Sequence, residues 1–124
     1  MREERLRATA GLRQSSLALS SWRGRSGRRY IVGVHPFIES DLLEVTEAVM
    51  IAVKRDRDGV AHVIDIATAG SRPSRDARTR WMSNVQAHGA TELHGHRLAA
   101  TDQARRAVIA DLREDEAELS QGRG

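Results

Sequence analysis

The pattern of apolar and polar residues is clearest in the middle of the chain, where two apolar runs flank a turn. Residues 48–53 form an unbroken apolar run of strand length, which is typical of a strand buried on both faces. Residues 60–67 follow Asp58-Gly59, a dipeptide that strongly favours a tight hairpin turn. The sequence therefore predicts a central β-hairpin over residues 48–67.

Two further strands are predicted on the N-terminal side of this hairpin. Residues 28–35 alternate loosely, which favours a strand, and Pro36 ends it because proline cannot donate to the ladder. Residues 17–23 predict a shorter strand, and a glycine-containing turn over residues 24–27 joins the two. We expect a short capped helical turn at residues 40–43.

Helix, strand and helix are predicted to follow the hairpin. The first helix begins after the N-cap Ser74 and ends near Gly89. Residues 91–98 predict a strand, and Thr101 caps the last helix. Four residues of the first helix lie on one face, and four of the last helix can face the core: Ala77, Trp81, Met82 and Val85, then Ala104, Ala107, Val108 and Leu112.

This order predicts an α+β fold, a small, mainly antiparallel sheet covered by two helices. We expect one domain over residues 17–118, with a flexible, arginine-rich segment at 1–16 and a disordered tail at 119–124. The hairpin forms its core, with Trp81 and Val108 packed against it.

Composition narrows the classes of function. The chain has no cysteine, which excludes disulfides and thiolate metal sites. No apolar run reaches membrane-spanning length, so we expect a cytoplasmic protein without a membrane partner. The net charge of +3 is uneven, because residues 1–29 carry eight arginines against two acidic residues and the remainder is mildly acidic.

Several short segments occur in a fixed order on the predicted elements. They are Trp22, Ser26-Gly27-Arg28-Arg29-Tyr30, His88-Gly89-Ala90-Thr91 and Ala104-Arg105-Arg106, followed by Asp111-Leu112. Together with the order of elements over residues 22–112, they resemble bacterial relatives of the GIY-YIG nucleases. The resemblance implies a glycine-aromatic triplet on a central strand, a Tyr-Ile-Gly triplet on the next strand, a helix arginine and a later metal-holding glutamate.

The positions of those catalytic groups depart from the pattern. Met50 and Asp65 stand where the resemblance implies the two tyrosines. Arg80 matches the helix arginine, whereas the glutamate position falls near residues 108–109, with Asp111 one turn further on. Cleavage of a phosphodiester needs an activated nucleophile and a charge-stabilising cation. We therefore expect a relic site of Met50, Asp65, Arg80 and Asp111 without nuclease activity.

Two other groups of residues are candidates for binding. His94 and His96 alternate along one predicted strand and so share a face with Glu92, an arrangement that occurs at zinc and iron sites. The alternative is a pair of strand histidines, each with a backbone or carboxylate partner. Four arginines near Trp22 and Tyr30 are candidates for nucleic-acid contact, and the alternative is a solvated hairpin tip. They are Arg23, Arg25, Arg28 and Arg29.

Three functions remain open at this point. The first is a non-catalytic binding or interaction module without a cofactor, whose partner is nucleic acid held by the N-terminal arginines or else a protein. The second is a diverged DNA endonuclease that uses Mg²⁺ or Mn²⁺ and relies on Arg80 and Asp65, with His94 or His96 as base or ligand. The third is a small metal-binding protein centred on His94 and His96.

Overall fold

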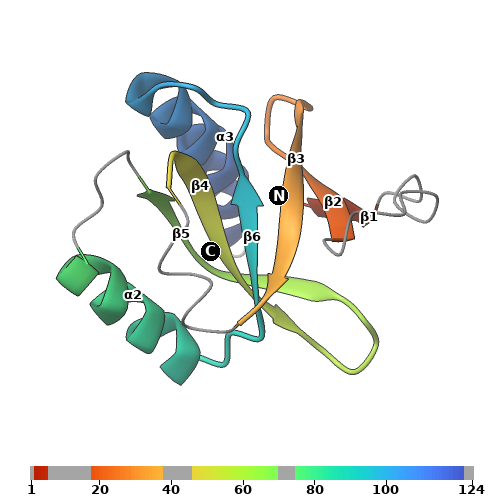
Figure 1. Cartoon of the computed structure of the whole chain (residues 1–124). Helices are drawn as coiled ribbons and strands as arrows, with labels where there is room; N and C mark the ends of the chain where they lie inside the picture. Colours follow the sequence, from red (N-terminus) through yellow and green to blue (C-terminus); the bar gives the residue numbers. More distant parts are fainter. Residues whose placement is uncertain (1, 6–17, 38–45, 70–74, 122–124) are drawn as a thin grey trace.

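In the part of the chain that the structure describes, a six-stranded antiparallel sheet forms the body of the protein, and two helices pack against it (Figure 1). The computed structural model describes residues 2–5, 18–37, 46–69 and 75–121. The strand order is β1-β2-β3-β6-β4-β5. The elements are β1 (Arg2–Arg5), β2 (Ala18–Arg23), β3 (Arg29–Pro36), β4 (Ala48–Arg55), β5 (Ala61–Ala69), α2 (Arg75–Ala87), β6 (Glu92–His96) and α3 (Asp102–Gln121).

The predicted central hairpin is confirmed as β4 and β5. Residues 48–53 are all buried, because β4 lies between β5 and β6 and is covered on both faces. At the turn, the Asp56 carboxylate accepts hydrogen bonds from the backbone N–H groups of Asp58 and Val60. Gly59 has a φ of 82°, a conformation that glycine adopts without steric cost. The turn chemistry therefore fixes the register in which Arg55 pairs with Ala61.

The two helices cover opposite faces of the sheet, as the alternation along β4 shows. Val49, Ile51 and Val53 belong to an apolar cluster that includes residues of α3. Ala48 and Met50 belong to a second cluster, which includes Met82 and the partly buried Trp81 of α2. Because successive side chains of a strand point to opposite faces, α2 and α3 lie on different sides of the sheet (Figure 1).

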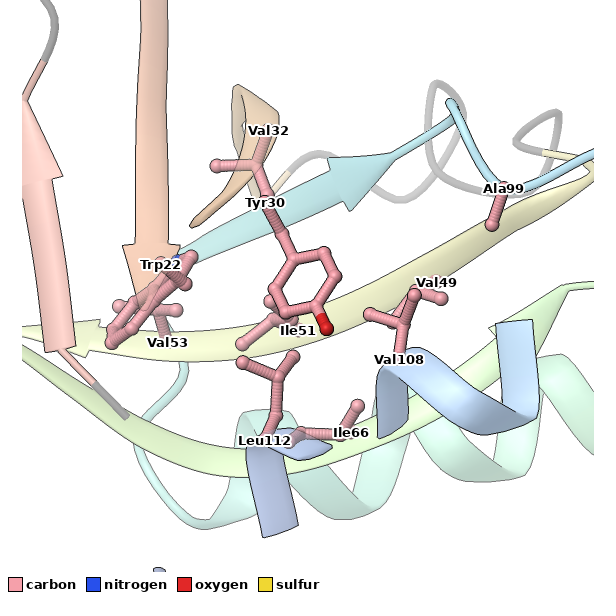
Figure 2. Packing of buried hydrophobic residues seen from close by; sticks show 10 residues of the cluster. All are labelled: Trp22, Tyr30, Val32, Val49, Ile51, Val53, Ile66, Ala99, Val108 and Leu112. Atoms are coloured by element: carbon pink, nitrogen blue, oxygen red, sulfur yellow. The ribbon is translucent and has the colours of Figure 1, made fainter. Parts of the chain in front are cut away.

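The larger cluster lies on the α3 side. Trp22 and Tyr30 enter it from β2 and β3, while Val108 and Leu112 extend from α3 toward the sheet (Figure 2). Leu112 and Trp22 are 0% and 1% exposed. The predicted packing of Trp81 and Val108 against the hairpin is thus confirmed, with one residue on each face.

The helix boundaries follow the predicted signals where the structure describes them. Gly89, with a φ of 96°, ends α2, and the N–H of Ala90 bonds back to the carbonyl of Val85. The hydroxyl of Thr101 accepts from the N–H of Ala104, so it caps α3. The N-cap Ser74 and the helical turn at residues 40–43 lie outside the described residues.

Both ends of the chain differ from the expectation. Arg2–Arg5 form strand β1, paired with β2, within the segment expected to be flexible. Helix α3 extends to Gln121, beyond the boundary expected at residue 118. Neither part has an alternating apolar pattern that would have predicted it. For the described residues, the α+β class and the antiparallel sheet with two helices are confirmed. No helix in the described ranges is long and apolar enough to cross a membrane.

Candidate functional site

A buried histidine is at the centre of the polar contacts on the α3 side of the sheet. His94 is fully buried, and its Nδ1 accepts a hydrogen bond of 2.9 Å from Nε1 of Trp22. The indole N–H can only donate, so Nδ1 carries no proton. The proton therefore sits on Nε2, which donates to Oε1 of Glu92 at 2.9 Å. These two bonds fix both the tautomer and the neutral state of His94.

Arg55 joins this histidine to the first strand. Its guanidinium bonds both carboxylate oxygens of Glu3, at 2.7 and 3.0 Å, and both of Glu92, at 2.8 and 3.2 Å. The three side chains are only 10–19% exposed. Although burial by itself raises the pKa of Glu3 and Glu92, the hydrogen bonds and charge of Arg55 outweigh it, and the pKa of each lies below its usual value.

A second polar cluster holds the β2–β3 turn against α3. Oδ2 of Asp111 accepts from the hydroxyls of Ser26 and Tyr30, each at 2.7 Å, and Oδ1 accepts from the N–H of Ser26 at 2.8 Å. Gly24 faces the same carboxylate, and any side chain there would collide with it. Burial raises the pKa of Asp111, but the Tyr30 and Ser26 hydrogen bonds outweigh it, and the pKa falls below its ordinary value.

An open pocket of about 470 Å³ lies beside this cluster, and we call it the Asp111 pocket. Its polar lining comes from the β2–β3 turn, β3, β6 and α3, and its apolar lining from α3 and the segment before it. The lining residues are Ser26, Arg28, Tyr30, His96, Leu98, Ala99, Ala104, Ala107, Val108 and Asp111. A hollow of this size with a few converging polar groups is typical of a ligand site.

His96 supplies one wall of the Asp111 pocket. Its Nδ1 lies 2.7 Å from the carbonyl oxygen of Ile31, and a carbonyl only accepts, so Nδ1–H is the donor. In the neutral ring, Nε2 is then an acceptor. The ring of Tyr30 stands edge-on to His96, with centroids 5.4 Å apart. The positions of both aromatic walls are thus fixed by hydrogen bonds to other groups.

The predicted relic residues are not brought to one place. Met50 is buried on the α2 side of the sheet, whereas Asp111 holds the β2–β3 turn on the α3 side. Asp65, on edge strand β5, accepts from Nε1 of Trp81 at 2.7 Å and from Arg113 at 3.3 Å. Arg80 is an exposed residue of α2 and does not line the Asp111 pocket.

The two histidines share a face, as predicted, and each has the kind of partner that the alternative to metal binding requires. His94 contacts the Glu92 carboxylate and His96 a backbone carbonyl. Both ring nitrogens of His94 are engaged within the protein. Among the described residues, no group of three His, Asp or Glu side chains is arranged to hold a metal ion.

The four candidate arginines divide into two pairs. Arg23 and Arg29 lie 3.1 and 3.4 Å from the carboxylate of Glu4. Arg25 and Arg28 are exposed at the turn, and Arg28 lines the Asp111 pocket. Glu4 of β1 thus neutralises part of the basic cluster. The pairing of β1 with β2 brings Glu4 to Arg23 and Arg29. The spacing of the arginines in the sequence could not have predicted these ion pairs.

Sequence reasoning missed the roles of Arg55 and Glu3, and it placed Tyr30 only as a neighbour of the arginines. The one available signal was the shared face of Glu92 and His94, since Arg55 follows an apolar run and looks like an ordinary hairpin residue. The contacts of Arg55 with Glu92 and Glu3 span 37 and 52 positions in the chain, a separation that local patterns do not encode.

No family model, curated protein or solved structure matches this chain.

Acidification should destabilise the fold in two stages. Burial lowers the pKa of His94 below 6.5, outweighing Glu92 and Glu3, so the unfolded chain binds more protons and stability falls as pH drops below about 6.5. The lowered pKa values of Glu3 and Glu92 extend the loss below about 4.5. Urea unfolding followed by tryptophan fluorescence at several pH values measures both stages. His94→Gln should flatten the upper stage, and an unchanged pH profile in that variant would contradict this assignment.

The single tyrosine permits a direct test of the second cluster. Burial first, and then the hydrogen bond and charge of Asp111, raise the pKa of Tyr30 to about 12. Asp111→Asn should lower this pKa while leaving it above 10, because the burial remains. The ultraviolet absorbance of the phenolate reports the titration, with Asp102→Asn on the same helix as the matched control. Equal tyrosine titrations in wild type and Asp111→Asn would rule out the proposed coupling.

Proposed function

We propose that this chain is a non-catalytic binding module on a scaffold like that of the GIY-YIG nucleases, with the Asp111 pocket as its ligand site. The order of elements supports the scaffold. A central strand, β4, is followed by β5 as its neighbour, by α2 carrying Arg80, and then by β6 and α3. This is the order that the resemblance implies over residues 22–112.

The residues at the implied catalytic positions, and their burial in the core, support the absence of DNA cleavage. Met50, at the first tyrosine position, is 4% exposed and packs on the α2 side. Val108, at the glutamate position, is 7% exposed and packs on the opposite side. Neither side chain is a nucleophile or holds a cation. A sheet separates the two positions, so they do not form one centre for phosphodiester hydrolysis.

The observation that carries the binding proposal is the convergence of polar groups around the Asp111 pocket. Tyr30, His96 and Asp111 reach it from three separate elements, each fixed by a hydrogen bond, and Arg28 adds an exposed cation from the β2–β3 turn. A pocket whose groups are already positioned lowers the conformational cost of binding. The ligand it favours has an anionic group for Arg28 and a compact body for the pocket. A nucleotide at the end of a single strand fits both requirements.

Fluorescence anisotropy with a labelled single-stranded oligonucleotide tests this proposal. Deleting residues 1–29 is unsuitable because it removes β1, β2 and the buried Trp22. Arg28→Gln should instead weaken binding several-fold and reduce the salt slope by about one, as expected for one lost phosphate contact. Arg57→Gln, an exposed arginine at the other hairpin, is the matched control and should bind like wild type.

The same protein, incubated with plasmid and Mg²⁺ or Mn²⁺, should leave the plasmid intact. Strand scission that disappears in Arg80→Ala would overturn the non-catalytic assignment and establish the nuclease alternative.

In the anisotropy experiment, equal affinities of Arg28→Gln and Arg57→Gln, or no binding of the oligonucleotide at low salt, would overturn the assignment of the Asp111 pocket as a nucleotide site.

A further inference from the structure

A second hollow lies on the other face of the sheet, away from α3. Gly33 of β3 and Gly95 of β6 are directly paired there. The side chains of Tyr30 and Val32 point to the α3 side, so the alternation along β3 places the Cα hydrogens of Gly33 on the opposite face. By the same alternation along β6, Gly95 shares that face with Leu93 of the α2-side cluster. A glycine inside a strand weakens it and often marks close approach by a ligand or another backbone. The pairing leaves a floor of bare backbone.

Apolar side chains stand around this floor. With Gly33 and Gly95 they form an open groove of about 330 Å³, which we call the Gly33–Gly95 groove. Ile31 and Leu98, in its walls, are 45% and 72% exposed. Val60 is the one other large apolar residue with comparable exposure in the described ranges. Ile31 and Leu98 are exposed beside the same hollow, so they form a continuous apolar patch. Exposed apolar patches mark interaction sites, whereas single, scattered apolar residues do not.

The charge of the groove is one-sided. Arg97 lies in its lining, and the remaining lining residues are Leu19, Ile31, Val32, Gly33, His35, Gly95 and Leu98, none of which is acidic. No residue of α2 lines it, although α2 covers the other half of this face. The exposed Arg97 guanidinium therefore offers an anionic ligand a countercharge at the edge of an apolar hollow.

We propose that the Gly33–Gly95 groove binds a small planar apolar anion, such as an aromatic carboxylate or sulfonate. The flat ring system lies on the backbone between the two glycines, where no Cβ obstructs it. Leu19, Ile31 and Leu98 surround the ring, and Arg97 pairs with the anionic group. The floor of this groove is on the opposite face of the sheet from the Asp111 pocket, although Leu98 lines both hollows. The proposal does not depend on the function proposed for the Asp111 pocket.

Fluorescence titration of the full chain with 8-anilinonaphthalene-1-sulfonate, an aromatic anion with a flat naphthalene ring, tests the proposal. Gly95→Val fills the floor and should weaken binding at least about fivefold, since the ring loses its place on the backbone. A Cβ at Gly95 makes only an ordinary contact of 3.8 Å with His35, so Gly95→Ala is a milder second variant that keeps the fold. Cooperative urea unfolding of each variant confirms that the fold is retained.

Two controls separate this site from general apolar binding. Arg97→Gln should weaken binding of the sulfonate about two- to fivefold but leave unchanged the affinity for the uncharged N-phenyl-1-naphthylamine. Val60→Ser removes an exposed apolar residue elsewhere and should bind both probes like wild type. Absence of a fluorescence increase with wild type, or equal sulfonate affinity in wild type, Gly95→Ala and Gly95→Val, would overturn the proposal.

Discussion

The guanidinium of Arg55 is the contact on which the shape of the sheet depends. It lies at the end of β4 and bonds Glu92 of the neighbouring β6, but also Glu3 of β1. Strand β1 is four positions away from β4 in the sheet order. A flat sheet would hold these side chains well apart, since neighbouring strands are about 4.8 Å from each other. The sheet must therefore curl, and Arg55 closes the curl.

The curl creates the concave side on which the larger apolar cluster is built. At one end, Nε1–H of Trp22 donates to Nδ1 of His94, and Nε2–H of His94 donates to Glu92, which Arg55 also contacts. At the other end, α3 adds Leu112, and Asp111 holds the β2–β3 turn. Burying charged and polar side chains costs free energy of folding unless each of them has a partner. These contacts give each of these side chains a partner. The Asp111 pocket lies at the rim between helix and curled sheet.

Local sequence patterns predicted those elements of the fold that depend on residues close together in the chain. The turn at Asp58-Gly59, the buried run of β4 and the capping of α3 by Thr101 each depend on neighbouring residues, and each is confirmed. Strand β1 was not predicted because a polar tetrapeptide becomes a strand here through pairing with β2 and a charge contact with Arg55. The shared face of Glu92, His94 and His96 was predicted, and Glu92 is one partner of His94. The other partners, Trp22 and the Ile31 carbonyl, come from β2 and β3, and the sequence pattern does not specify where those strands lie.

A double-mutant cycle between Glu3 and Arg55 tests the central claim most directly. The free energy of unfolding is measured for wild type, Glu3→Gln, Arg55→Met and the double variant. If Arg55 closes the curl through Glu3, the two substitutions should couple by about 1–3 kcal/mol, with the double variant less destabilised than the sum of the single ones. Additivity within about 0.5 kcal/mol would contradict the account, because it would mean that the contact between Glu3 and Arg55 does not stabilise the folded sheet.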